Sequence, residues 1–581
     1  MKFRTFIVPL AIVAGLILVL GLGLLGGFAL RNPLYLLDRG GQALPEALVF
    51  VPQQSPIVLS VLARPDRFGQ LWQYLAPPQR RHQIQADITQ LEQALLADTG
   101  LSYRRDIQPW LGEEITAAVV SPDVDQDPTN GVTPGYLVVL SCRDSQTARS
   151  TLELFWQNRA LAGAPLTFED RAGSRLIYAQ DLGSGDSRGN RRSNFQQLST
   201  ALVANHFVLV ANHPEVLRQA LTAAQTEDGH LSASPRYRTA LKALPPRRVG
   251  LLALNLPATN HWLGGNLGDG DGFPLLGDLD SPEPGVDWGL ISFTLDRQGI
   301  MADAAWIAAL GHRLQPHQDR FEDWYSLARF LPTQLAFAAL GQNWADLRQT
   351  LQPFLTLLDR PNFTQLTPLP LDGAFGRGAT QQLLAGLDQP FSLGLALSTP
   401  TSPPHWLLVT PLSDPLAATV ASLDDLAQAK GLGVAPVTIF NHPTTAWTRL
   451  SILSPGNLSA STPAPQIQAE ITGLHAQLGE HVVLSTAAGV MEQALGSAQA
   501  APAPSSWTQQ LDRFKQPSQA YLHVDWPQLQ DALQQQVPQF RLWETIARPL
   551  LKHLRQITVA QYRQTDQVQT MGLFLHLGNP E

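Results

Sequence analysis

The sequence predicts an α+β fold, in which an N-terminal transmembrane helix is followed by two tandem, internally duplicated domains. Each domain is expected to hold a mainly antiparallel sheet with helices packed on one face. Three observations lead to this prediction. The chain has 581 residues, more than one ordinary core accommodates. Residues 6–30 form an uncharged apolar run, and later segments recur in the same order about 270–280 positions apart.

The repeat begins with "FVPQQSPIVLSVLARPDRFGQLW" from Phe50, which matches "FLPTQLAFAALGQNWADLRQTL" from Phe330. Next, "GYLVVLSCRDSQTARSTLELFW" matches "HWLLVTPLSDPLAATVASLDDLA", each being a strand, a polar cap and a helix. Three further pairs of segments follow at a nearly constant offset. Five matches in one order indicate a tandem duplication, with an anchor at 1–37, a first repeat at 38–315 and a second at 316–581.

The elements within each repeat follow from local patterns. Alternation in "LVVLSC" and "LISFTL" predicts strands, and "STLELFW" and "EVLRQAL" predict helices. Asp144 or Ser145 is expected to cap one helix, and Ser413 or Asp414 its counterpart. The strands come mostly in hairpins, which favours an antiparallel sheet. Regular strand–helix–strand alternation, which would favour a parallel sheet, is absent.

The apolar run at the N-terminus, Phe6 to Leu30, is 25 residues long. A helix that crosses the hydrocarbon layer needs ~20 apolar residues, whereas a cleaved signal peptide has an apolar region of ~7–15. We therefore expect an uncleaved single-pass anchor. Flanking basic residues give nearly equal counts on both sides. The short N-terminal tail and the lack of a second span favour an N-terminus in the cytoplasm and a body outside it.

Composition excludes several classes of protein and site. An apolar share of 44% does not fit a disordered chain. The formal net charge of −8, without a basic stripe, gives no support to nucleic-acid binding. Cys142 is the single cysteine, so neither an intramolecular disulfide nor a cysteine-based zinc site can form.

A family resemblance rests on the N-terminal anchor and on two segments, "LPEALVFVPQQSPIVLSVLARPDRF" and "TGLSYRRDIQPWLGEEITAAV". With these features the chain resembles a family of cyanobacterial membrane-anchored proteins catalogued as a domain of unknown function. The resemblance covers most of the chain and implies a location, in the periplasm or the thylakoid lumen. It implies no activity and no catalytic residues.

Two motifs raise the question of catalysis or phosphate binding. Glu113 and Glu114 adjoin at the start of a predicted strand. Neighbouring strand residues point to opposite faces, so we expect a solvated strand end and not a carboxylate pair. "GAFGRGAT" (373–380) resembles a phosphate-binding loop, but Ala379 stands where its lysine should be, so we expect a turn.

The other candidate groups are interpreted as structural. The acidic loop 264–285 lacks the spacing of a calcium loop, although a cation site there stayed open. Histidines that follow asparagine or stand near helix starts are expected in turns, Cys142 as a buried thiol, and the tryptophans in the core. The residues concerned are Asp269, Asp271, Asp278 and Asp280 of the loop, histidines His206, His213, His261 and His442, and tryptophans Trp72, Trp110, Trp156, Trp262, Trp288 and Trp344.

The sequence therefore predicts no catalytic, cofactor-binding or metal-ligating residue. We expect a non-enzymatic, membrane-anchored extracytoplasmic binding or scaffolding protein. Its partners would be the membrane, through residues 6–30, and an unknown protein or lipid. Two alternatives stay open: a carrier of lipid or pigment in a sheet-lined apolar cavity, and a hydrolase with a nonstandard site.

Overall fold

The fold is given by a computed structural model. It describes these ranges: 36–37, 40–42, 44–67, 100–124, 133–179, 198–267, 285–314, 316, 321, 324–344, 347, 383–384, 387–397, 405–453, 466–499, 507–514, 518–530 and 553–578. No helix within these ranges has the length and apolarity needed to cross a membrane. The predicted anchor at residues 6–30 lies outside them.

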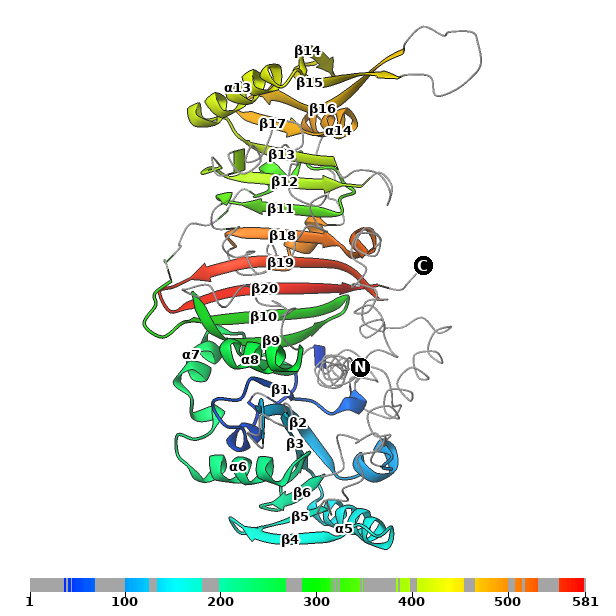
Figure 1. Cartoon of the computed structure of the whole chain (residues 1–581), viewed down its shortest axis with the longest axis vertical. Coiled ribbons are helices and arrows are strands. Elements are labelled where there is room, and N and C mark those ends of the chain that lie inside the picture. The colour runs from blue at the N-terminus through cyan, green and yellow to red at the C-terminus, as the bar shows by residue number, and fades with distance from the viewer. Residues whose placement is uncertain are drawn as a thin grey trace, which may run out of the picture.

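The described strands form one sheet of 20 strands, and every pairing in it is antiparallel. Figure 1 shows the strands stacked along the long axis of the molecule, from β4 at one end to β14 at the other. The prediction of an α+β fold with an antiparallel sheet is confirmed. In the N-terminal half the strands are β1 (Ile57–Val61), β2 (Leu111–Ser121), β3 (Gly135–Cys142), β4 (Leu166–Arg171), β5 (Ser174–Ala179), β6 (Ser199–Val203), β7 (Phe207–Ala211), β8 (Gly250–Asn255), β9 (Val286–Asp296) and β10 (Gly299–Ala308).

The C-terminal half repeats this arrangement. Pairing runs β4-β5-β6-β7-β3-β2-β1-β8-β9-β10 in the first half and β14-β15-β16-β17-β13-β12-β11-β18-β19-β20 in the second. Its strands are β11 (Phe337–Gly341), β12 (Phe391–Ala396), β13 (His405–Pro411), β14 (Gly433–Ile439), β15 (His442–Leu453), β16 (Gln466–Leu478), β17 (His481–Ser485), β18 (Ala520–Asp525), β19 (Leu554–Gln564) and β20 (Val568–Leu577). The two halves thus share one connectivity, while the boundaries at 37/38 and 315/316 stay predictions.

The halves meet where β10 pairs with β20, a junction we call the seam (Figure 1). Asp303 stands opposite Gly572 near the middle of this ladder. Arg513 of the second half adds a side-chain link, because its guanidinium lies 2.8 Å from an Asp296 carboxylate oxygen and 4.7 Å from the Phe574 ring centroid. The sequence predicts a separate sheet in each domain. The seam instead makes them one, because the last strand of each half presents its free edge to the other.

Helices cover both faces of this sheet, so the expectation of helices on one face is wrong. Along β7, Leu209 packs in a cluster with Val216 of α6, and its neighbour Val208 packs with Ala148 of α5. Adjacent strand residues point to opposite faces, so α5 and α6 lie on opposite sides. The equivalent helices α13 and α14 are divided in the same way along β17.

The helices begin where capping residues occur. Asp144 accepts from the backbone N–H groups of Gln146 and Thr147, and Ser413 caps the equivalent helix, as predicted. The helices are α5 (Ser145–Leu161), α6 (Pro214–Gln225), α7 (Pro235–Ala243), α8 (Leu256–Leu267), α9 (Trp324–Ala328), α13 (Asp414–Ala429), α14 (Ala488–Gln499) and α15 (Thr508–Leu511). Shorter turns are η1 (Ala47–Phe50), η3 (Tyr103–Ile107) and η4 (Leu231–Ala233).

The packing at the seam predicts that substitution of Gly572 destabilises the fold. A Cβ there would touch the Tyr562 hydroxyl and lie 2.6 Å from Tyr562 Cζ and 3.0 Å from Phe514 Cδ1. Gly572→Ala should lower the free energy of unfolding by about 1–3 kcal/mol through overpacking. Chemical denaturation followed by tryptophan fluorescence measures this change.

The control is Gly489→Ala in α14, where a Cβ would meet nothing within 4 Å. It should leave stability unchanged or raise it by about 0.4–1 kcal/mol. Equal denaturation midpoints for the Gly572→Ala variant and the wild type would contradict the packing assigned to the seam.

Candidate functional site

Among the described residues, the carboxyl group with the most perturbed pKa lies at the seam. The Tyr562 hydroxyl donates a hydrogen bond of 3.4 Å to Asp303 Oδ1, and both side chains are buried. Burial raises the pKa of Asp303 to about 6, although the Tyr562 hydrogen bond acts against this shift. The pKa of Tyr562 is raised as well, first by burial and then by the Asp303 charge. A shifted pKa suits acid–base chemistry, but here the group is enclosed in the joint between the halves.

His523 is a second perturbed group on this face of the sheet. Its Nδ1 lies 3.0 Å from Thr558 Oγ1, and its ring is 6.0 Å from that of Trp507. Burial, with a smaller effect of the nearby His576, lowers the pKa of His523 to about 4. The imidazole is therefore neutral at physiological pH and acts as a hydrogen-bonding member of the core.

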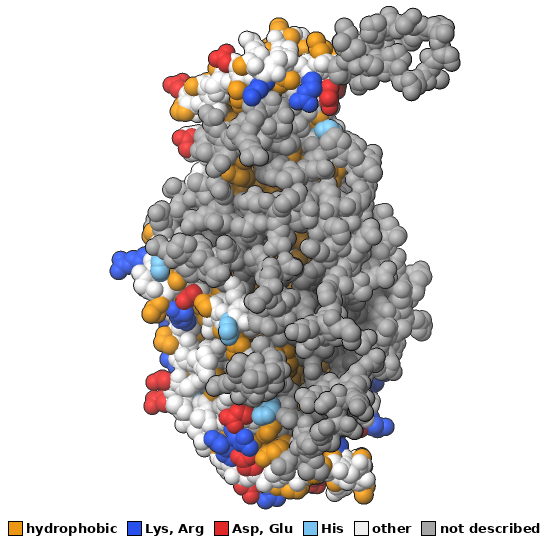
Figure 2. All heavy atoms as spheres, viewed as in Figure 1, with side chains coloured by type: hydrophobic (Ala, Val, Ile, Leu, Met, Phe, Trp, Pro, Cys, Tyr) orange, Lys and Arg blue, Asp and Glu red, His pale blue; other side chains and the backbone are white. Residues whose placement is uncertain are grey.

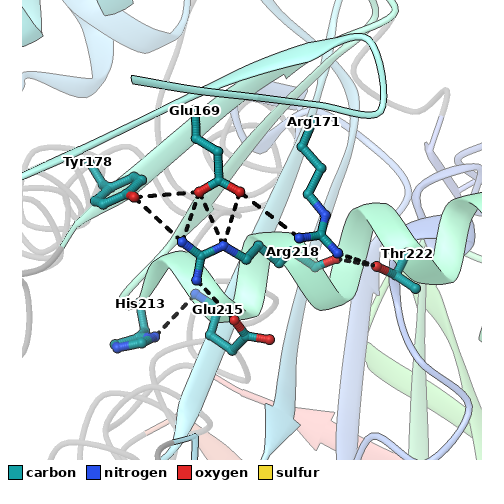
Figure 3. A network of polar contacts seen from close by, with 7 residues as sticks. All are labelled: Glu169, Arg171, Tyr178, His213, Glu215, Arg218 and Thr222. Carbon is teal, nitrogen blue, oxygen red and sulfur yellow. Dashed lines mark hydrogen bonds and ion pairs between the residues drawn. The ribbon is translucent and has the colours of Figure 1, made fainter. Parts of the chain in front are cut away.

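An ionic network fastens α6 to the β4–β5 hairpin (Figure 3). Arg218 on α6 donates from Nη2 to Glu169 Oε2 at 2.8 Å and from Nη1 to Glu215 Oε2 at 3.0 Å. The hydrogen bond from Arg218 lowers the pKa of Glu169. Tyr178 donates to the same carboxylate at 3.4 Å. The guanidinium is thus neutralised by two carboxylates of the protein itself, which makes the network a clamp and a poor anion site.

A third cluster joins α13 to the sheet. Asp424 Oδ1 accepts from Trp447 Nε1 at 2.7 Å and lies 3.0 Å from His475 Nε2. An aspartate that orients a histidine supplies two of the three members of a hydrolytic triad. Among the described residues, no serine, threonine or cysteine side chain forms a hydrogen bond with His475. The cluster therefore has the chemistry of a helix-to-sheet link.

The prediction for the Glu113–Glu114 pair was half wrong. Glu113 is partly exposed and pairs with Arg67 at 2.8 Å, as a solvated residue would. Glu114 is 1% exposed and accepts from the backbone N–H groups of Glu46 and Ala47 at 2.8 and 3.0 Å. It therefore caps η1, and its burial raises its pKa despite these bonds. Sequence could not show this role because the partners lie 67 and 68 positions away.

The turn prediction for the "NH" pairs is confirmed for His206, which lies in the turn between β6 and β7, whereas His442 is the first residue of β15. Asn205 and Asn441, which precede His206 and His442, have positive φ angles of 54° and 62°. His213 is the N-cap of α6, where its Nδ1 accepts from the Glu215 N–H at 3.1 Å. His261 lies within α8.

The remaining predictions concern buried groups. The core position is confirmed for Cys142, whose pKa burial raises to about 11. It is also confirmed for five tryptophans: Trp110, Trp156, Trp262, Trp288 and Trp344.

Several motifs lie outside the described residues: Trp72, the phosphate-loop-like segment 373–380 and the loop aspartates at 269, 271, 278 and 280. Residues 264–267 of the acidic loop continue α8. The described ranges hold no group of three or more His, Cys, Asp or Glu side chains placed to bind a metal.

A shallow, open depression runs beside the first turns of α5. It is lined by Asp144, Gln146, Thr147, Ser150, Thr151 and Leu154. The Asp144 carboxylate already accepts from two backbone N–H groups and from the Thr147 hydroxyl. The depression is open to solvent and does not enclose enough space to bury a small molecule.

Comparison with known families shows which family the chain belongs to. A family model described as "Protein of unknown function (DUF3352)" matches residues 11–577. The chain belongs to the DUF3352 family. Membership agrees with the resemblance to a family of unknown function, while the cyanobacterial origin and the membrane anchoring stay predictions.

No curated protein matches this DUF3352 protein. Among solved structures, crystal forms I and III of TP0453 are similar to it, with TM-scores of 0.25 and 0.24 and 10% sequence identity. They cover 50% and 51% of this chain and 88% and 90% of their own. With scores this low, the likeness supports no statement about function.

Asp303 predicts how the stability of this DUF3352 protein depends on pH. The folded protein keeps the carboxyl protonated up to about pH 6, whereas the unfolded chain releases the proton near the ordinary value of 3.8. Stability should therefore fall as pH rises from about 4 to about 6, by up to about 3 kcal/mol. Asp303→Asn should remove this slope and raise stability at pH 7, as measured by denaturation from pH 4 to 8.

The control for this series is Asp170→Asn on β4, which removes an exposed carboxylate. Its pH profile should run parallel to that of the wild type. A profile for Asp303→Asn that also runs parallel to the wild type would contradict the assignment of the slope to the seam.

The clamp between Arg218 and Glu169 predicts that its loss loosens the β4–β5 hairpin locally. Arg218→Met keeps the aliphatic stem and removes the charge, so amide hydrogen exchange across β4 and β5 should speed up. Because the pair is partly exposed, the loss of unfolding free energy should be about 1 kcal/mol. Arg175→Met, which breaks the exposed pair with Asp170 on the same hairpin, should leave the exchange unchanged. Slow exchange retained in Arg218→Met would disprove the clamp.

Proposed function

We propose that this DUF3352 protein is a non-enzymatic binding or scaffolding protein held at a cyanobacterial membrane. Residues 6–30 would span the bilayer once, with the N-terminus in the cytoplasm and the sheet in the periplasm or thylakoid lumen. The proposal rests on the uncharged 25-residue run and on how the described side chains are used. Ionic clusters of those residues join parts of the fold, while apolar side chains are exposed at both ends of the sheet.

The end formed by β14–β16 carries the observation on which the proposal depends. Leu450 on β15 is 65% exposed, and Ile471 on β16 is 39% exposed. Thr448 stands opposite Ile471, and Leu450 is two residues further along, so both side chains share one face of the β15–β16 ribbon. Val437 on β14 and Phe440 in the turn that joins β14 to β15 are also exposed, toward the other end of these strands. Figure 2 shows hydrophobic side chains over this upper end of the molecule.

The opposite end has a smaller set of exposed apolar side chains. Leu154 and Leu161 on α5 and Phe168 on β4 are each more than half exposed. The outermost strands carry features that disfavour pairing with a strand of another molecule. Charged residues follow Phe168 on β4, and Pro436 removes an N–H donor from β14. These features favour binding through side chains over the addition of a partner strand.

The test is native mass spectrometry of the full-length chain, expressed in a cyanobacterium and released from its membranes in mild detergent. We expect the mass of the uncleaved chain plus a protein partner in fixed ratio. Leu450→Asp with Ile471→Asp should abolish the partner mass, because it puts charge on the exposed face. Leu310→Asp, at an 84% exposed leucine of the N-terminal half, should retain it.

Other outcomes separate the alternatives. An excess mass identified as lipid or pigment, unaffected by the ribbon variants, would replace the proposal with a carrier. Recovery of the chain in the soluble fraction, without its first 30 residues, would disprove the uncleaved anchor. A bare chain that hydrolyses ester or peptide substrates would favour the hydrolase.

A further inference from the structure

The packing of Leu36 fixes where the proposed anchor joins the body. Leu36 is 1% exposed and lies in one hydrophobic cluster with Leu295 of β9 and Ile300 of β10. The residues that follow it are held at the same place, because the Gly41 N–H donates to the Arg248 carbonyl at 2.7 Å. Strands β9 and β10 lie in the middle of the stack (Figure 1). The chain therefore enters the body at the middle of the sheet and not at either end.

The length of chain before Leu36 limits how far the body can stand from the membrane. Only residues 31–35 separate Leu36 from Leu30, the last residue of the apolar run. An extended chain spans at most ~3.3–3.6 Å per residue, so these two leucines are at most about 20 Å apart. The headgroup layer takes up roughly 5–8 Å of that distance. If residues 6–30 span the bilayer, as the proposed function holds, the strand ends beside Leu36 lie against the membrane.

Two exposed arginines lie at these strand ends. Arg247 comes shortly before β8, and its Nη1 donates to the Leu37 carbonyl at 3.3 Å. The Arg247 carbonyl in turn accepts from Thr294 Oγ1, near the end of β9, at 3.1 Å. Arg297 follows in the turn between β9 and β10. Both guanidinium groups therefore belong to the edge of the sheet at which the chain enters the body.

The charge of these two arginines is not balanced by carboxylates. Asp296 precedes Arg297 in the chain, but it already pairs with Arg513 at 2.8 Å. Among the described residues, neither Arg247 nor Arg297 forms an ion pair with a carboxylate. The formal net charge of the whole chain is −8, so positive charge at this edge does not follow from the composition.

The repeat supplies a comparison with the opposite edge of the sheet. Because β10 and β20 pair antiparallel, the turn before β10 and the turn before β20 lie at opposite edges. The turn before β20 (565–567) is the equivalent in the second half, and it contains the exposed Asp566 and no basic residue. Arg297 thus stands in the turn on the side that the anchor reaches, and an acidic residue stands in the repeated turn on the other side.

We propose that Arg247 and Arg297 bind the anionic headgroups of the lipid leaflet on the body's side of the membrane. Guanidinium groups form charge-assisted hydrogen bonds with phosphate, and an anionic surface attracts basic side chains that lie within a Debye length. With this edge on the lipid, the strands point toward the bilayer and the long axis of the sheet runs along it. The apolar ends, including the β15–β16 ribbon, then lie beside the membrane and stay open to a partner.

The test is amide hydrogen exchange, followed by mass spectrometry, of the full-length protein in lipid nanodiscs. Peptides that cover the β9–β10 turn and residues 245–250 should exchange roughly fivefold more slowly with phosphatidylglycerol in the bilayer than with phosphatidylcholine alone. High salt should remove this difference. Arg247→Gln with Arg297→Gln should lose it as well, with unchanged exchange in β3 and β13 as the sign of an intact fold. The matched control, Lys430→Gln with Arg449→Gln, removes two exposed charges near the β14 end and should keep the difference.

The same experiment separates failure of the lipid contact from failure of the anchor. A chain that stays in the nanodiscs but exchanges equally at this edge in both lipids would overturn the contact and leave the anchor in place. Protection that survives in Arg247→Gln with Arg297→Gln, or that falls on β4 or β14 instead, would overturn the contact in the same way. A chain that is not retained in the nanodiscs would disprove the anchor and the contact together.

Discussion

The antiparallel pairing of β10 with β20 is the constraint on which the rest of the molecule depends. Each half ends in a long hairpin, β9–β10 or β19–β20, whose outer strand has an unpaired edge. Exposed edges of that length are prone to uncontrolled pairing, and joining the two edges satisfies both. The repeat explains why the edges fit, since β10 and β20 are equivalent strands and their antiparallel pairing is centred on Asp303 and Gly572. Outward from the seam, every other strand takes its place by pairing with the one before it.

The seam also shows how the duplicated halves have diverged. At its centre, one half supplies a buried aspartate and the other a glycine that leaves room for Tyr562. The same divergence occurs at Arg248 and Ser518, which stand two residues before the equivalent strands β8 and β18 and whose carbonyls each accept a backbone hydrogen bond. Each substitution changes the polarity of a position whose backbone hydrogen bonds are retained. The common backbone frame therefore tolerates different interior chemistry, and polar groups that serve one half are not copied in the other.

Polar side chains in the described parts of both halves mostly serve to attach helices to the sheet. Arg218 holds α6 to a hairpin, and Asp424 holds α13 to β15 and β16. In the first half, α5 is attached by hydrogen bonds from Trp156 Nε1 to Thr200 and from Arg149 Nη2 to Asn205 in the β6–β7 turn. Long sheets need such links because helices at their ends contact few neighbouring strands. The exposed apolar residues at the two ends then remain as surfaces for contact with other molecules.

The sequence by itself determined the repeat, the alternating strands, the capped helices and the antiparallel class, because these depend on neighbours within a few residues or on matching segments. It also placed Cys142 and most tryptophans in the core, since burial follows side-chain type. Only the tertiary structure decided that one continuous sheet forms, that helices lie on both faces and that Glu114 is buried. It likewise decided that Asp303 meets Tyr562, 259 positions away. Such contacts are set by strand register and edge pairing, which one-dimensional periodicity does not encode.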